Sequence, residues 1–373
     1  MKCLLSVVFF FRVSVNMTSI DQLDALPFPE GGSLSLSVDG KYLACIPNSN
    51  KSIVNIYSSK DAAPLKTIHV PGYDKLDHTP SSLQVTCVWS AQNVVYIVSS
   101  WGHFYSASSS SDWEVKPVPN FNPKNCGSRN YHRIALQRDL AVIASDCELL
   151  VWSGGNRLGI LPFSRPDHVF SMEIHPSGSF VALCLRTAGS VAIVALNGSN
   201  PELTCHLGRT PRDVAEDEFQ TPAELNDDDE TLNSFPVMLN QVVLRNPPVA
   251  CCWSKYGDNL VVASSEELLS IWSIPSSTIS TVSLSDEGGK IFIRNAKFVN
   301  DSLVAVAVDN PHRILFVDVD EGVLYSSDEN ATIEGGSSKN SSMDFSINKN
   351  GSNVVIFRPC LSNKTINRWV LAL

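Results

Sequence analysis

One pattern of short apolar strands recurs seven times along this chain of 373 residues. Each unit holds a strand, a short polar turn that often contains glycine, and a second strand of the Leu/Val-Ala type. A last strand often closes on an aromatic residue. The apolar residues recur with a period of two rather than 3.6, which predicts β-strands. Anchoring each unit at the residue before its turn gives Leu36, Trp89, Ala135, Ile174, Trp253, Phe298 and Ile347.

The spacing of these units indicates the architecture. Successive anchors lie 39 to 53 residues apart, except for the 79 between Ile174 and Trp253, where an insertion follows a unit. Blades of four strands repeat every ~40–45 residues, and propellers close with about 4 to 8 of them. Each unit exposes an apolar face that it cannot bury alone. We therefore predict an all-β protein, a single seven-bladed β-propeller over 31–373, with a loop inserted at about 197–246.

The remaining residues, 1–30, are predicted to be an N-terminal extension. Met1-Lys2 precedes a short apolar run, but Arg12 interrupts it and no small-x-small cleavage site follows. The run is too short to cross a membrane. Residues 1–16 are thus a signal-like segment, an artefact upstream of Met17 or a buried extension. We expect strand material from the N-terminal region to close the ring by pairing with the last blade.

Two of the turns carry a family resemblance. Ile174-His175-Pro176-Ser177-Gly178 and Trp253-Ser254-Lys255-Tyr256-Gly257 resemble the strand–turn signature of the WD-repeat superfamily, and the resemblance covers roughly 30–373. The repeats are degenerate. Trp152-Ser153 and Trp272-Ser273 stand where the family often has Trp-Asp, and its Gly-His element is reduced to Asp167-His168. We therefore expect most of the family's Asp–His–Ser–Trp hydrogen-bond network to be missing and the blades to hold by packing.

A narrower resemblance suggests a cellular role. The stretches 52–66 and 140–152 are similar to blades of the propeller nucleoporins of the aladin type. This resemblance implies a component of the nuclear pore complex at the nuclear envelope. The wider family resemblance leaves a WD-repeat adaptor of another cytosolic complex as the alternative.

The charge of the chain is concentrated in the insertion. Lys and Arg number 28 against 38 Asp and Glu, and nine of these acidic residues lie between Asp213 and Glu230 with no basic residue among them. The net charge of −10 disfavours a nucleic-acid-binding groove or a polybasic membrane-binding surface on this chain. We interpret the run as an acidic docking segment for a basic partner, with partner-binding residues Asp227, Asp228, Asp229 and Glu230. The alternatives are a solvated loop and, less favoured because the spaced register is absent, a calcium site.

Few other residues suggest chemistry. Trp101 lies in a turn context and is predicted to be exposed as a partner contact. The eight histidines form no His-x-x-x-His pair, and we expect His168 and His175 to satisfy loop hydrogen bonds. There is no nucleophile elbow, phosphate-binding loop or dinucleotide fingerprint. We therefore predict no catalytic, cofactor-binding or metal residue and no enzyme. A hydrolase or lyase that uses the central channel is the alternative.

The ten cysteines bear on the compartment. Cys87 and Cys251 occupy the same place in two units, and Cys45 and Cys184 lie in apolar strand patterns. Equivalent positions of a repeat are too far apart for a disulfide, so these thiols are predicted to be buried and reduced. The expected function is a non-catalytic protein-interaction scaffold in an intracellular multiprotein complex, cytoplasmic or nuclear, without nucleic acid or membrane insertion. Eight Asn-x-Ser/Thr sequons leave a secreted glycoprotein propeller as the alternative.

Overall fold

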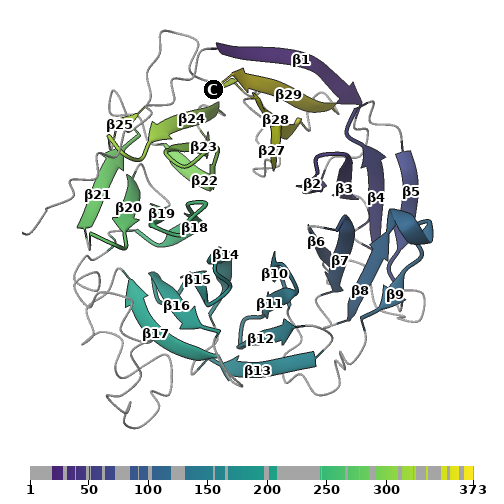
Figure 1. Ribbon diagram of the computed structural model, residues 1–373, viewed down its shortest axis with the longest axis horizontal. Coiled ribbons are helices and arrows are strands. Elements are labelled where there is room, and N and C mark those ends of the chain that lie inside the picture. Colours follow the sequence, from purple (N-terminus) through teal and green to yellow (C-terminus); the bar gives the residue numbers. More distant parts are fainter. Residues whose placement is uncertain are drawn as a thin grey trace, which may run out of the picture.

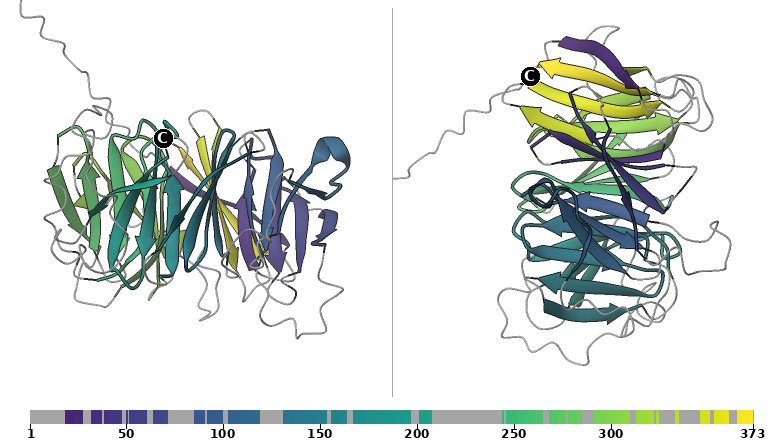
Figure 2. Two further views of the ribbon diagram at one scale, coloured as in Figure 1. Left: turned by 90° about the horizontal axis from the view of Figure 1, so that it is seen from below. Right: turned by 90° about the vertical axis from the view of Figure 1, so that its right-hand side faces the viewer.

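The computed structural model is a ring of seven antiparallel sheets around a central axis (Figure 1). It describes residues 19–372 with gaps at 28–31, 38, 48–49, 51, 61–63, 72–84, 91, 100–102, 119–130, 154–155, 164–166, 197–200, 208–243, 245, 265–267, 277, 285–290, 310–312, 322, 325–332, 335–345, 351–352 and 361–364. From the side the ring is a disc with the strands running across its thickness (Figure 2). The structure confirms the seven-bladed β-propeller.

Each blade is built from strands that follow one another from the central axis outwards. Blade 1 consists of β2 (Gly32–Leu36), β3 (Tyr42–Pro47), β4 (Ile53–Ser58) and β5 (Pro64–His69). Blade 2 consists of β6 (Val85–Trp89), β7 (Val94–Ser99), β8 (Phe104–Ser108) and β9 (Lys116–Pro117). Blade 3 consists of β10 (Arg133–Gln137), β11 (Leu140–Ala144), β12 (Glu148–Ser153) and β13 (Asn156–Pro162). Blade 4 consists of β14 (Val169–Ile174), β15 (Phe180–Leu185), β16 (Ser190–Ala195) and β17 (Glu202–Leu207).

The remaining three blades complete the circle. Blade 5 consists of β18 (Pro248–Trp253), β19 (Asn259–Ser264), β20 (Leu268–Ser273) and β21 (Thr278–Ser283). Blade 6 consists of β22 (Phe292–Phe298), β23 (Leu303–Asp309), β24 (Arg313–Asp318) and β25 (Val323–Leu324), with β26 (Ile333–Glu334) also pairing with β24. Blade 7 consists of β27 (Ser346–Asn350), β28 (Asn353–Cys360), β29 (Thr365–Ala372) and β1 (Ser19–Pro27). All seven anchors of the sequence repeat fall in the innermost strands, β2, β6, β10, β14, β18, β22 and β27.

The ring closes between the two ends of the chain. β1 pairs antiparallel with β29, from Ser19 opposite Ala372 to Pro27 opposite Thr365, and so supplies the outermost strand of blade 7. This confirms the expected closure. It also corrects the boundary placed at residue 31, because β1 lies within the predicted extension. Likewise β17 pairs with β16, although β17 lies within the range predicted as an inserted loop. The first part of that range therefore includes the outermost strand of blade 4.

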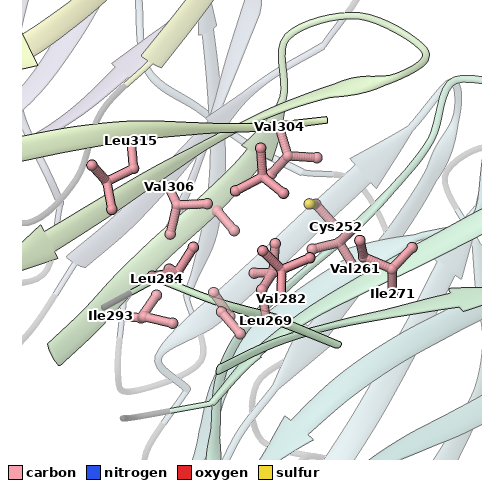
Figure 3. Close-up of a cluster of buried hydrophobic side chains, with 14 of the residues drawn as sticks. Cys252, Val261, Leu269, Ile271, Val282, Leu284, Ile293, Val304, Val306 and Leu315 are labelled. Atoms are coloured by element: carbon pink, nitrogen blue, oxygen red, sulfur yellow. The ribbon is translucent and has the colours of Figure 1, made fainter. Parts of the chain in front are cut away.

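The core lies between neighbouring blades. Successive side chains of a strand point to opposite faces, so each middle strand packs against two neighbours. In β19, Val261 faces blade 6 and Val262 faces blade 4; in β23, Val304 faces blade 5 and Ala305 faces blade 7. Figure 3 shows the contact between blades 5 and 6, where Cys252, Val261, Leu269, Ile271, Val282 and Leu284 meet Ile293, Val304, Val306 and Leu315.

Two of the blade tryptophans are held by apolar packing. The indole nitrogens of Trp152 and Trp272 are buried and have no hydrogen-bond partner among the described residues. Both rings instead lie in apolar clusters, Trp152 beside Phe104 and Trp272 beside Leu260. The helical content of the described ranges is one 3-10 turn, η2 (Ser109–Ser111). No helix in these ranges is long and apolar enough to cross a membrane.

Candidate functional site

The residues predicted to bind partners lie outside the part of the chain that the structure describes. Asp227, Asp228, Asp229 and Glu230 fall in the gap 208–243, and Trp101 falls in the gap 100–102. Their roles stay predictions. The described residues present two other arrangements, one on each face of the disc.

The first arrangement is the ring of turns that join the first and second strands of each blade. Because all blades have the same connectivity, these turns lie on one face, which we call the turn face. Five of the turns are closed by a backbone hydrogen bond across the turn, from Ser37 to Tyr42, Ser90 to Val94, His175 to Phe180, Ser254 to Asn259 and Val299 to Leu303. Four of these five turns also contain a residue with positive φ, namely Gly40, Asn93, Gly178 and Gly257.

Polar side chains link neighbouring turns across the blade boundaries. Asn93 Nδ2 donates to Asp39 Oδ2 at 2.8 Å, from blade 2 to blade 1. Gln137 Nε2 donates to the carbonyl of Pro176 at 3.2 Å, from blade 3 to blade 4. Burial acts to raise the pKa of Asp39, but hydrogen bonds from Lys41, Ser37 and Asn93 outweigh it and bring the pKa to about 2.

His175 makes the link between blades 4 and 5. Its Nδ1 accepts the backbone N–H of Ser177 at 3.1 Å, so the ring proton sits on Nε2, which faces the carbonyl oxygen of Gly257 at 3.4 Å. The imidazole also packs edge-on against Trp253, with centroids 4.8 Å apart. Burial lowers the pKa of His175 below 6.5, despite opposing contributions from the Gly257 carbonyl and Asp258. The expected loop hydrogen bonds of this histidine are confirmed.

Tyr256 is the most exposed large hydrophobic residue in the described ranges, at 65%. It stands in the blade 5 turn, beside the His175 link, and the Lys255 ammonium lies 5.1 Å from its ring centroid. Aromatic residues are enriched among the side chains that contribute most to binding at protein interfaces. Tyr256 was not singled out from the sequence, although its place in the turn motif was visible there.

The second arrangement lies on the opposite face of the disc. His132 directly precedes β10, Asp146 lies in the turn from β11 to β12, and His168 directly precedes β14. Nδ1 of His168 lies 3.0 Å from Asp146 Oδ1, and Nδ1 of His132 lies 3.6 Å from the same oxygen. The two imidazoles stack with centroids 4.2 Å apart and planes at 10°. We call these three residues the two-histidine cluster.

Backbone hydrogen bonds hold this cluster in place. The amide of Asp167 donates to the carbonyl of Asp146 at 2.7 Å, and the amide of Arg186 donates to the carbonyl of His168 at 3.0 Å. The Asp167 carboxylate is buried and accepts the amides of Thr187 and Ala188 at 2.7 and 2.8 Å. Segments from blades 3 and 4 are therefore fixed against each other beside the histidines.

The cluster as a unit is not among the sequence-based predictions. The contact with Asp146 confirms the predicted hydrogen bonding of His168, but no motif connects His132 or Asp146 with that residue. The three lie 14 and 22 residues apart along the chain. A signal was present, because His132 and His168 each stand immediately before the innermost strand of adjacent blades. Equivalent places in neighbouring repeats lie on the same face of a propeller.

Four of the described cysteines are buried in the core, whereas Cys147 is exposed. Cys184, Cys251 and Cys252 are buried free thiols in the blade interfaces. Burial raises the pKa of Cys205 to about 12 and that of Cys252 well above its usual range. Thiols of this kind are unreactive and pack as small hydrophobic groups.

Comparisons with known proteins identify the fold and no family. No protein-family model matches the chain, and no curated protein matches it. Among solved structures, a chain of the crystal structure of the mitotic checkpoint complex is similar, with a TM-score of 0.60 and 11% sequence identity over 99% of this chain and 96% of that one. At this identity the likeness shows a shared propeller fold.

Proposed function

We propose that this propeller is a non-catalytic protein-interaction scaffold within an intracellular multiprotein complex. The observation that carries the proposal is the turn face, where hydrogen bonds between neighbouring blades hold Tyr256 and Lys255 on a fixed platform. A fixed exposed aromatic loses little conformational freedom when it binds a partner. That a propeller of similar fold is part of the mitotic checkpoint complex supports the same kind of role.

The specific form that we propose is a nuclear-pore component of the aladin type, which rests on the resemblance of the stretches 52–66 and 140–152. A WD-repeat adaptor of another cytosolic complex would use the same turn face. The buried thiols favour a reducing compartment, cytoplasmic or nuclear, over secretion.

Purification of the tagged full chain from native extract tests the proposal. We expect a defined set of co-purifying proteins, at least one of which is lost in Tyr256→Ser. The matched control is Leu65→Ser, because Leu65 is also an exposed hydrophobic residue but lies on the outermost strand of blade 1. If the two variants retain the same proteins, the turn face is not the docking site.

Two further results decide between the classes of function. A mass that falls on glycosidase treatment, together with fewer than ten reactive thiols after denaturation, would establish the secreted alternative. Nucleoporins among the co-purifying proteins would support the pore assignment, and a different, reproducible complex would replace it with a general adaptor. A chain that purifies alone under all these conditions contradicts the scaffold proposal.

A further inference from the structure

We infer that the two-histidine cluster is a binding site for a divalent transition-metal ion of the zinc class, held by Nδ1 of His132, Nδ1 of His168 and a carboxylate oxygen of Asp146. The inference is independent of the scaffold function. The three ligand atoms all lie within 4.8 Å of one another. They come from blade 3 and from the segment that enters blade 4, so the ion would join two blades.

The separations of the ligand atoms suit a small tetrahedral ion. Ligand atoms that each lie about 2.1 Å from a tetrahedral zinc ion are about 3.4 Å apart. The two histidine-to-Asp146 separations, 3.0 and 3.6 Å, fall on either side of that value. Two imidazoles and one carboxylate are a donor set that zinc accepts, with nickel, copper and ferrous iron as competitors.

The hydrogen bond on the far side of His132 prepares its Nδ1 for a metal. Nε2 of His132 lies 3.2 Å from the carbonyl oxygen of Val169, which accepts a hydrogen bond from the Nε2–H group. The neutral tautomer with that proton leaves a lone pair on Nδ1, on the side of Asp146. A partner on the second ring nitrogen is the usual way in which proteins fix a metal-binding histidine.

His168 makes the larger adjustment. Its Nδ1 lies at hydrogen-bond distance from Asp146, so without a metal this nitrogen carries a proton. On metal binding the proton moves to Nε2 of a side chain that is 39% exposed and can reach solvent. The stacked rings must also splay, because parallel rings direct their Nδ1 lone pairs in parallel. The half-exposed ring of His168 has room to tilt, whereas His132, at 10%, is held.

The site retains an open position. Asp146 is 32% exposed and His168 is 39% exposed, so water can reach an ion bound between them. Three protein ligands with an open position leave a fourth place for water or for a group of a partner. The surrounding hydrogen bonds of Asp167 and Arg186 fix the backbone that carries Asp146 and His168 before the ion arrives, so that binding requires only side-chain movement.

The test is a calorimetric titration of the full chain with zinc after stripping with a chelator. We expect one zinc ion to bind per chain at this site. Asp146→Asn is the decisive variant, because an amide oxygen still accepts the His168 hydrogen bond but lacks the ligand charge. Its zinc affinity should fall at least tenfold while its melting temperature without metal stays near that of the parent. His168→Gln should show the same loss.

His69→Gln is the matched control, because His69 is exposed on β5, away from the cluster. It should bind zinc as the parent does, which separates this site from binding elsewhere on the chain. Cobalt should give the absorption of a tetrahedral site without a sulfur charge-transfer band, and zinc should raise the melting temperature of the parent but not that of Asp146→Asn.

Three results would overturn the inference. These are the absence of zinc binding by the parent, equal affinity in the parent and Asp146→Asn, or a cobalt spectrum with thiolate ligation. In each case the three residues form a hydrogen-bonded cluster and no metal site.

Discussion

Nε2 of His175 and the carbonyl oxygen of Gly257 lie 3.4 Å apart and join two equivalent turns from blades 4 and 5. The residues are 82 positions apart in the chain. Each turn has its own glycine with φ of 81°, Gly178 and Gly257. The imidazole fills the space in which a side chain at the second glycine would otherwise stand.

Gly257→Ala should destabilise the ring more than Gly178→Ala. A methyl group at Gly257 would lie 1.8 Å from His175 Nε2, whereas one at Gly178 meets nothing within 4 Å. Both changes carry the strain of a side chain at positive φ, about 1–2 kcal/mol. Loss of the His175 contact should add about 0.5–1.5 kcal/mol to Gly257→Ala alone. Denaturant unfolding of both variants measures the difference, and equal losses would refute the clash.

Acidification should weaken the fold below pH 6.5 through His175 and His103, because burial lowers both pKa values in the folded state. The unfolded chain then binds more protons than the folded one, so stability rises with pH across this window and is lost as pH falls. His175→Asn should reduce the slope of stability against pH between 6.5 and 5. An unchanged slope in chemical unfolding at each pH would show that His175 does not titrate in this way.

Asp39 should stabilise the fold at neutral pH, and this stabilisation should disappear in strong acid. Its folded pKa of about 2 lies below the usual 3.8, so its contribution is present above pH 3.8 and is lost as the pH falls towards 2. Asp39→Asn should therefore be less stable than the parent at neutral pH and should approach it near pH 2. Acid titrations followed by circular dichroism compare the two, and a difference that stays constant with pH would rule out the linkage.

Removal of 369–373 should destabilise the whole ring in one transition. The deletion takes away buried Trp369 and Leu371, each worth several kcal/mol in a core. It also removes the residues of β29 that pair with the first half of β1. A matched pair of N-terminal deletions isolates the closure: removing 1–27 should lower the melting temperature, whereas removing 1–18 leaves β1 paired with β29. If the C-terminal deletion melts like the full chain, the closing strand does not support the ring.

Deletion of the acidic run 213–230 should leave the melting temperature unchanged or slightly raised, because exposed like charges repel one another. The deletion should weaken the binding of only those partners whose affinity falls with salt. Charge attraction of this kind is screened beyond the Debye length, which is about 8 Å at physiological ionic strength. Unfolding of the ring would mean that the run is structural. Identical binding of every partner at low salt would mean that it is only a solvated loop.

The blades could be predicted from the sequence because each one repeats the same pattern of apolar strands and polar turns. Short apolar strands such as Phe180–Leu185 and turn glycines such as Gly257 recur along the chain, and stacking follows from the apolar faces that a single blade cannot bury. The strand Ser19–Pro27 was harder to place, because its partner lies at the other end of the chain. The contacts of His168 with Asp146 and His132 arise only when blades 3 and 4 pack, so motif spacing alone did not reveal them.

The pairing of β1 with β29 determines how the ring responds to mechanical force. Ser19 lies opposite Ala372, so the first residue of one strand and the last of the other sit at the same end of one antiparallel ladder. A pull on both ends of the chain would load these hydrogen bonds one pair at a time, from Ser19 towards Pro27, rather than all together. The β1–β29 pair would then separate at low force. Heat or denaturant, in contrast, must disrupt all the blade interfaces cooperatively.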